Sequence, residues 1–299
     1  MTFDDDDWQL TGDLEEFLGR AGAFLRSEPA LHTVQLTVSH KLRTEGATAY
    51  GDRAPYYGWL ADKHGTVRAT VLRTPPYQLN LTALTAEDAD ALAARLAQDG
   101  RMIPSAGGPA EAAAAFAAAS EKRTGTTARL RMRQRLYRLG TLTPPEPTPP
   151  GNARLAAADD RGLVARWYAE FCADVGERAA QDPDGWAGSK LARGGLMLWE
   201  TPDGTPVAMA GTTPEVAGQV RVAPVYTPAP LRGRGYAGAA TAAVSRAALD
   251  SGAKEVLLFT DLANPTSNGL YQRLGYRAVT DFSLYEFSEQ GGGEGPSRT

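Results

Sequence analysis

The residues from Arg232 to Gly238 have the composition of a loop that binds a diphosphate. Gly233, Gly235 and Gly238 spell G-x-G-x-x-G, the fingerprint of a dinucleotide-binding turn. Read from Arg232, the same stretch spells R-x-x-G-x-A, a second pattern for a pyrophosphate-binding loop. In both readings glycines let backbone amides approach phosphate oxygens, and the following helix points its positive end at them. The neighbouring segments must decide between the two.

Those segments exclude the dinucleotide reading. A dinucleotide-binding fold needs its first glycine directly after a strand, and an acidic residue at the end of the next strand. Here the preceding strand is expected to stop near Tyr226, and Pro228 and Pro230 intervene before Gly233. Glu255 lies at a suitable distance, but it begins the next apolar run instead of ending it. The remaining chain is also too short for the other strands of such a domain.

The second half of the chain alternates helix and strand signals around the loop. Two apolar runs flank an Asp203–Gly204 turn, which predicts a hairpin. Asn264, Pro265 and Gly275 have the types favoured at the start and the end of a helix. We therefore expect helices over 153–175, 236–250 and 264–275, a hairpin over 190–213, and strands over 219–226, 255–260 and 282–287.

This half, most strongly over 194–287, closely resembles the GNAT superfamily of acyl-CoA-dependent N-acetyltransferases. The resemblance rests on "VRVAPVYTPAPLRGRGYA" followed by "NPTSNGLYQRLGYR", which carry R-x-x-G-x-A and then N-x-x-S-x-x-x-Y-x-x-x-G-Y in the expected order. It implies an α/β (α+β) fold, a mixed central sheet flanked by helices, and acetyl-CoA as co-substrate. Pantetheine would pair with the main chain of a strand that splays from its neighbour. The implied cofactor-binding residues are Val225, Tyr226, Thr227, Arg232, Gly233, Arg234, Gly235, Tyr236, Ala237, Asn264 and Ser267.

The resemblance also gives Tyr271 a catalytic role. In the family this tyrosine protonates the departing thiolate as general acid, and an ordinary tyrosine pKa near 10 keeps it protonated at neutral pH. Asn264 has two compatible roles, helix N-cap and a contact to the cofactor arm. Pro224 lacks an N–H group, which predicts a bulge or an interrupted ladder in the strand before the loop.

The general base is left open. An alkylammonium acceptor must lose a proton before it attacks, and a carboxylate would take it. Glu170, Glu200, Glu215 and Asp261 all lie in the second half. Spacing does not select among them, and Asp261 is weakly favoured because it ends a strand beside the cofactor.

The first half repeats the order of the second without its glycine loop. A hairpin turning at His64–Gly65 precedes an expected strand, and "LNLTALTAEDADA" stands where the second half has "TPAPLRGRGYAG". A degenerate first copy and an intact second copy resemble tandem members of the superfamily. The expected domains are 1–140, a proline-rich linker over 141–151, a catalytic domain over 152–288, and a flexible tail over 289–299.

Composition limits the other functions. A net charge of −4 and a pI near 5.5 give no general attraction to nucleic acid or anionic membrane. The arginines on alternate positions 129–135 are therefore interpreted as a solvated or interdomain face of a strand. One cysteine, Cys172, and three histidines form no disulfide and suggest no metal site. The acidic N-terminus does not resemble a signal peptide, so we expect a cytoplasmic protein.

The sequence therefore predicts an acyl-CoA N-acetyltransferase that acetylates an amine of a small molecule by direct attack through a tetrahedral intermediate. The N-terminal copy is expected to be catalytically silent. Two alternatives stay open: a non-catalytic acetyl-CoA sensor or scaffold, and an acetyltransferase that acts on peptide or protein amines.

Overall fold

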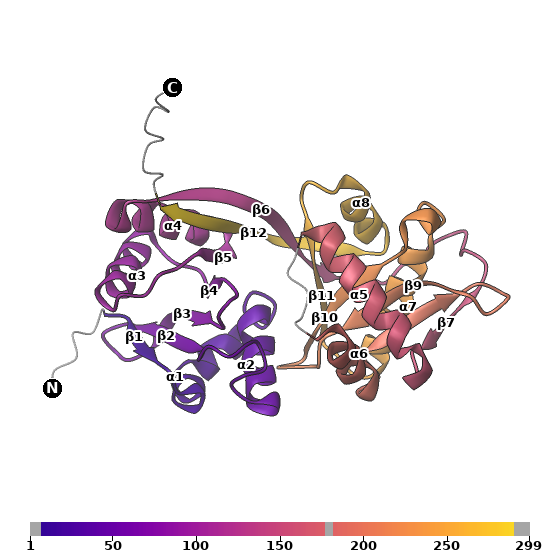
Figure 1. Ribbon diagram of the computed structural model, residues 1–299, viewed down its shortest axis with the longest axis horizontal. Helices are drawn as coiled ribbons and strands as arrows, with labels where there is room; N and C mark the ends of the chain where they lie inside the picture. The colour runs from indigo at the N-terminus through magenta and orange to yellow at the C-terminus, as the bar shows by residue number, and fades with distance from the viewer. Residues whose placement is uncertain (1–6, 177–181, 290–299) are drawn as a thin grey trace, which may run out of the picture. The chain divides into compact units, whose positions relative to one another are not determined.

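A computed structural model describes residues 7–176 and 182–289, and the chain forms two compact units (Figure 1). The N-terminal unit contains the described residues up to Arg135, together with Asp261–Ala263 and the described residues from Thr280 onward. The C-terminal unit contains Leu136–Thr260 and Asn264–Val279. Each unit is therefore assembled from separate stretches of chain.

The N-terminal unit is a mixed sheet covered on both faces by helices. Its strands pair antiparallel from β1 to β4, and β4 pairs parallel with β5. Phe17 of α1 stacks on Tyr57 of β2, while α3 and α4 pack on the opposite face through the core that contains Leu92 and Phe116. The elements are β1 (Gln9–Thr11), α1 (Leu14–Ser27), α2 (Thr33–Glu45), β2 (Tyr56–Ala61), β3 (Val67–Arg73), β4 (Leu79–Leu81), α3 (Ala86–Gln98), β5 (Ser105–Pro109), α4 (Ala110–Thr124) and β6 (Thr126–Leu139).

The C-terminal unit has the same element order. Strands β7 to β10 pair antiparallel, and β10 pairs parallel with β11. The elements are β7 (Asn152–Leu155), the short 3-10 helix η1 (Ala158–Asp160), α5 (Arg161–Val175), α6 (Pro183–Ala192), β8 (Leu196–Glu200), β9 (Pro206–Thr212), β10 (Gln219–Tyr226), η2 (Ala229–Leu231), α7 (Tyr236–Asp250), β11 (Glu255–Asp261), α8 (Pro265–Arg273) and β12 (Tyr276–Glu289).

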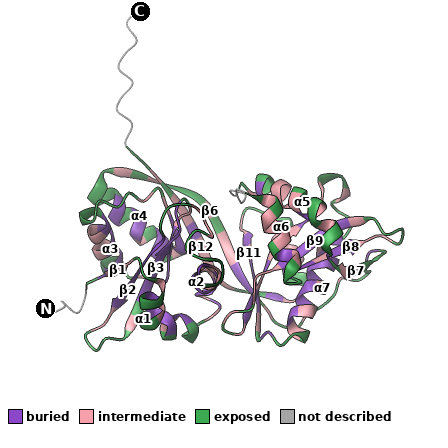
Figure 2. Cartoon of the chain, turned by 60° about the horizontal axis from the view of Figure 1, so that its bottom comes forward, coloured by how far each residue is buried: buried purple, intermediate pink, exposed green. Residues whose placement is uncertain are grey.

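The C-terminal sheet has one apolar core on each of its two faces. Val222 and Tyr226 are four residues apart and would share a face in a regular strand, but the register of β10 on β9 shifts between Val222 and Val225, and the two side chains lie on opposite faces. Val222 joins the core under α7 and α8, which includes Ala240 and Tyr271. Tyr226 joins the core under α5 and α6, which includes Trp167. Figure 2 shows this pattern as buried strands between helices that are exposed on their outer sides.

The repeated order confirms the predicted alternation of the two halves, with one exchange. β5 does not pair with β6, the strand that follows it in the repeat. It pairs antiparallel with the C-terminal strand β12, from Phe282 opposite Pro109 to Glu286 opposite Ser105. Strand β6 lies next to β11 instead. The last strand of the second half, β12, thus lies next to β5 of the first half, and the last strand of the first half, β6, lies next to β11 of the second half.

The predicted hairpins, the helix over 236–250 and the N-cap at Asn264 are confirmed. The helix expected over 153–175 is wrong at its start. Asn152–Leu155 form the edge strand β7, and the helix begins at Arg161. Arg154 bonds to Glu200 of the neighbouring strand, a tertiary contact that outweighs local helix propensity.

The proline-rich stretch expected as a linker over 141–151 is part of the C-terminal unit and packs against its other elements. Thr143 N–H donates to the carbonyl of Leu274 at the end of α8, and Trp199 Nε1 donates to the carbonyl of Pro150. Pro149 lies 3.7 Å from the position that a Cβ would occupy at Gly235. The division into domains stays a prediction, and residues 290–299 of the expected tail lie outside the described residues.

Candidate active site

Strand β10 separates from β11 partway along its length. The parallel ladder between them covers Gln219 to Arg221, opposite Glu255 to Leu257. β10 then continues to Tyr226, paired only with β9 on its other side. The β9 register shifts between Val222 and Val225, so the bulge or interrupted ladder predicted at Pro224 is confirmed. Backbone groups of residues 222–226 therefore border a place where a further extended group could pair.

The loop after β10 ends in two glycines that suit an anion. Gly233 and Gly235 have φ of +78° and +84°, which other residues adopt only with strain. Gly235 is the N-cap of α7, whose first intrahelical bond runs from the N–H of Ala239 to the carbonyl of Gly235. The N–H groups of Tyr236, Ala237 and Gly238 thus precede the helix ladder and remain available to a ligand. A helix N-terminus with such amides attracts phosphate.

The two arginines of the loop differ. Arg232 pairs with Asp174 of α5, and its Nε donates to the carbonyl of Thr227 at 2.9 Å. Arg234 is exposed, and its hydrogen bond from Nη2 to the carbonyl of Pro230 is long, at 3.4 Å. Arg234 is therefore the cation more readily available to a phosphate, whereas Arg232 ties the loop to α5.

Thr227 offers a direct test of whether a polar group fits beside the end of β10. Its hydroxyl oxygen is buried and has no hydrogen-bond partner among the described residues. Such an orphaned group is costly unless a ligand or water satisfies it. Thr227 lies directly after residues 222–226, the free stretch of β10 that no longer pairs with β11. This stretch and Thr227 therefore fit an extended ligand with amide groups, as pantetheine has.

Helix α8 carries the other predicted residues. Asn264 caps it by accepting the N–H of Ser267 at 3.0 Å, which confirms the structural role. Tyr137 of β6, for which the sequence indicated only a place in a basic strand, fixes this helix. Its hydroxyl donates to Oδ1 of Asn268 at 3.0 Å and accepts from Nε2 of Gln272 at 3.2 Å. A tyrosine in a long alternating strand gave no signal of this contact.

Tyr271 projects from α8 into the core shared with α7. It is 8% exposed and packs edge-on against Tyr276, with ring centroids 6.1 Å apart. Its hydroxyl makes no hydrogen bond to any residue that the structure describes, yet the oxygen is not among the fully enclosed polar atoms. Burial raises the pKa of Tyr271 to about 12, so the phenol keeps its proton at neutral pH.

A second polar group lies on the opposite face of the sheet. The hydroxyl of Tyr226 donates to Oε2 of Glu170 on α5 at 2.8 Å. Burial and this bond to Glu170 raise the pKa of Tyr226 to about 12. From α6, the buried Lys190 donates through Nζ to the carbonyls of Thr212 and Ala223, at 2.6 and 3.1 Å. Lys190 therefore fixes β9 to β10 at the bulge, a role that the sequence did not indicate.

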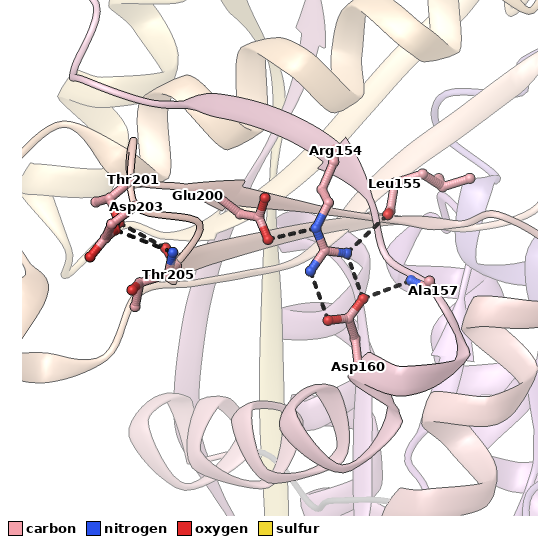
Figure 3. A network of polar contacts seen from close by, with 8 residues as sticks. All are labelled: Arg154, Leu155, Ala157, Asp160, Glu200, Thr201, Asp203 and Thr205. Carbon is pink, nitrogen blue, oxygen red and sulfur yellow. Dashed lines mark hydrogen bonds and ion pairs between the residues drawn. The ribbon is translucent and has the colours of Figure 1, made fainter.

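The other three carboxylates are placed elsewhere. Glu200 accepts Nε of Arg154 at 2.6 Å, in a network with Asp160 (Figure 3). Glu215 is exposed in the turn between β9 and β10. Asp261 belongs to the N-terminal unit and accepts the N–H of Ala263 at 2.8 Å.

Among its described residues, the N-terminal unit has neither a parted strand nor a glycine loop at the corresponding place. β4 ends at Leu81, directly after its short ladder with β5, and residues 82–85 lead straight into α3. Thr85 and Asp88 form a capping box at the start of α3. The buried Asp88 also accepts Nη1 of Arg68 at 2.6 Å. The start of α3 is thus occupied by a carboxylate of the protein itself, whereas the corresponding start of α7 has free amides.

The described residues contain no group of three or more His, Cys, Asp or Glu placed to hold a metal. A search of the described helices for a long apolar span finds none able to cross a membrane.

Comparisons with known proteins bear on the same segment. Residues 163–276 match the Acetyltransferase (GNAT) family. None of the curated proteins matches the chain.

Solved structures share the fold along nearly the whole chain. A GCN5-related N-acetyltransferase from Sphaerobacter thermophilus is 18% identical with a TM-score of 0.60, covering 95% of this chain and 96% of its own. A GNAT-family acetyltransferase from Colwellia psychrerythraea is 11% identical with a TM-score of 0.58, covering 94% and 100%. A tandem GNAT protein from the clavulanic acid biosynthesis pathway is 11% identical with a TM-score of 0.54, covering 96% and 100%. At these identities the likeness concerns the fold.

Proposed function

Since the chain carries a GNAT acetyltransferase domain, a domain of the acyl-CoA N-acyltransferase class, we propose that it transfers the acetyl group of acetyl-CoA to an amine of a small molecule. The observation that carries the proposal is the parting of β10 from β11 directly before two left-handed glycines and the free start of α7. The parted strand suits the amides of pantetheine, and the helix start suits the pyrophosphate.

Each predicted residue has a part in this proposal. Val225, Tyr226 and Thr227 would pair with the cofactor arm through their main chain. The loop from Arg232 through Ala237 would surround the pyrophosphate, and Asn264 and Ser267 would border the cofactor at the start of α8. A backbone N–H of the β10 stretch would stabilise the charge that develops on the thioester oxygen.

Tyr271 would act on the leaving group. It lies on the α7 face and keeps a proton on a hydroxyl that makes no bond within the described residues. We assign it as the general acid that donates to the sulfur as the C–S bond breaks.

The N-terminal unit would not bind acetyl-CoA. Its strand ends where the ladder ends, and Asp88 places negative charge at the helix start. A pyrophosphate there would meet like charge instead of free amides.

Calorimetric titration of acetyl-CoA into the whole protein tests the proposal. We expect one site per chain. Two sites would contradict the silent first unit, and no binding would contradict the function. Release of free thiol across a panel of small primary amines then separates an enzyme from a sensor, because a sensor binds acetyl-CoA and releases none.

A further inference from the structure

We infer that Glu170 is the general base, and that the acceptor amine reaches the thioester from the α5–α6 face of the sheet. This inference rests on the proposed function. It adds the second catalytic residue and the side from which the substrate enters.

The first step concerns the two faces of the sheet. The thioester lies, under the proposed function, where β10 and β11 part. Tyr271 belongs to the core on the α7–α8 face, and the start of α7 is on that face as well. The leaving group and the pyrophosphate therefore take the α7–α8 side. The nitrogen attacks one face of the planar carbonyl, and the side that the leaving group and the pyrophosphate do not occupy is the α5–α6 face.

The second step identifies the carboxylate on that face. Tyr226 is the last residue of β10, and its ring lies in the core under α5 and α6. Its hydroxyl donates to Oε2 of Glu170 at 2.8 Å. Of the four candidates, Glu170 is thus the one that bonds to the free stretch of β10. Glu200 bonds to Arg154, Glu215 is exposed in a turn, and Asp261 belongs to the other unit.

The third step concerns the state of Glu170. Because the pKa of Tyr226 is raised to about 12, its hydroxyl stays a donor throughout the neutral range. That bond fixes one carboxylate oxygen. Within the described part of the chain no other hydrogen bond to Glu170 is formed, so Oε1 remains available to an ammonium group. A half-buried carboxylate with one oxygen fixed and one free suits a general base.

The other charged groups near Tyr226 and Glu170 already have partners of their own. On α5, Asp174 pairs with Arg232, whose guanidinium lies 5.9 Å from the centre of the Tyr226 ring. On α6, the ammonium of Lys190 is directed at backbone carbonyls. Of these groups, Glu170 is the carboxylate that is not paired with an arginine.

The protons of the reaction then balance. Glu170 takes the first proton from the alkylammonium and passes it to solvent. The neutral nitrogen attacks the carbonyl carbon, and the C–S bond breaks as the adduct collapses. The second proton leaves the nitrogen for solvent as the amide forms. Tyr271 gives one proton to sulfur and regains one from solvent. The products are the acetamide, the thiol of CoA and one proton.

The test compares Glu170→Gln with Glu215→Gln, which removes a carboxylate from the exposed turn. Glutamine can still accept the Tyr226 hydroxyl, so the variant should fold. We expect its affinity for acetyl-CoA, by calorimetry, to stay within about twofold of the wild type. With 1,4-diaminobutane, 2-phenylethylamine and the rest of the amine panel as probes, kcat at pH 7 should fall by about 10²-fold or more. Glu215→Gln should match the wild type.

The pH profile distinguishes a base from a structural residue. Without the base, turnover depends on amine that is already neutral, and an alkylamine has a pKa near 10. We therefore expect kcat of Glu170→Gln to rise steadily from pH 7 to 9.5, so that its deficit shrinks. Glu170→Asp, which keeps a carboxylate, should recover part of the rate at pH 7.

The outcomes separate the two proposals. Failure of the wild type to bind acetyl-CoA overturns the proposed function. Binding without thiol release from any amine of the panel overturns both the enzyme and its base. Turnover by the wild type with an unchanged rate and pH profile in Glu170→Gln overturns the assignment of Glu170 alone. A loss of acetyl-CoA binding in Glu170→Gln also overturns it, because the residue would then hold the strand.

Discussion

At the scale of single residues, Tyr271 combines a protonated hydroxyl with the absence of a described hydrogen-bond partner. A pKa of about 12 lies above that of an ordinary thiol, about 8.5, so full transfer of the proton to a free thiolate would be uphill. The hydroxyl therefore helps most while charge is developing on sulfur, by donating a hydrogen bond that strengthens as the C–S bond breaks.

Substitution of Tyr271 by Phe should lower kcat by about 10²-fold, the usual size of a general-acid contribution, and leave the acetyl-CoA dissociation constant nearly unchanged. Tyr276→Phe is the matched control. Tyr276 is the neighbouring buried ring, and its hydroxyl bonds to Ser245 at 2.7 Å, so its loss should lower stability and not kcat. Single-turnover thiol release measures both variants. An equal rate for Tyr271→Phe and wild type would remove the acid role.

Gly235→Ala tests the loop with a control for backbone strain. An alanine at φ of +84° costs about 1 kcal/mol, and the new Cβ would meet Pro149 at an ordinary 3.7 Å. Gly65 in the β2–β3 turn has φ of +80° and open space around it, so Gly65→Ala carries the same strain away from the site. Both variants should unfold at similarly lower urea concentrations. Only Gly235→Ala should bind acetyl-CoA at least tenfold more weakly. Equal affinities in the two variants would show that the loop does not bind the cofactor.

At the scale of elements, a charged network fixes the edge strand β7. Arg154 donates to Asp160 from Nη1 at 2.6 Å and to Glu200 from Nε at 2.6 Å, which joins β7 to β8 and to the turn before α5 (Figure 3). Asp160 also accepts the N–H of Ala157. These bonds hold the pKa of Asp160 below its usual range. The network thus explains why residues 152–155 are a strand where local propensity favours a helix.

Asp160→Asn should lower the free energy of unfolding by about 1–2 kcal/mol at pH 7. The folded-state pKa of Asp160 is lowered, so its contribution is complete above its unfolded value near 3.8 and is lost as pH falls below that value. The difference between variant and wild type should therefore shrink between pH 5 and pH 2.5. Urea unfolding across this range measures it, with the exposed neighbour Asp159→Asn as control. A difference that is the same at every pH would show that the carboxylate charge has no part in it.

The elements also show what a sequence can and cannot predict. Gly235, Asn264 and the Asp203–Gly204 turn are recognised locally, because φ, capping and turn chemistry depend on a few adjacent residues. The bulge followed from Pro224 for the same reason. The bond from Tyr226 to Glu170 joins residues 56 positions apart, so spacing alone left four carboxylates open. Strand β7 was missed because a distant glutamate decides its conformation.

At the scale of the whole molecule, the two units share an element order but complete it with each other's last strand. The C-terminal residues of β12 belong to the N-terminal unit, where they pair with β5. Phe287 packs edge-on against Phe116 of α4, with ring centroids 6.1 Å apart, and its N–H donates to the carbonyl of Pro104 at 2.9 Å. Ion pairs from Arg135 to Asp281 and from Arg131 to Glu286 add to this attachment. Pairing between residues so far apart in the chain leaves no local signal, and only the existence of the strand could be predicted.

Phe287→Ala should therefore weaken the N-terminal unit although residue 287 follows, in sequence, the segment 163–276 that matches the Acetyltransferase (GNAT) family. Deleting a half-buried ring costs about 1–2 kcal/mol, less than the 3–5 kcal/mol of a fully buried one. Hydrogen exchange should accelerate in β5 and α4 and stay unchanged in β10 and α7. The affinity for acetyl-CoA should be unaffected, because the loop and the parted strand belong to the C-terminal unit. Leu155→Ala, at an exposed position on β7, is the control for loss of an apolar side chain. Faster exchange in α7 as well would mean that the two units unfold as one cooperative block.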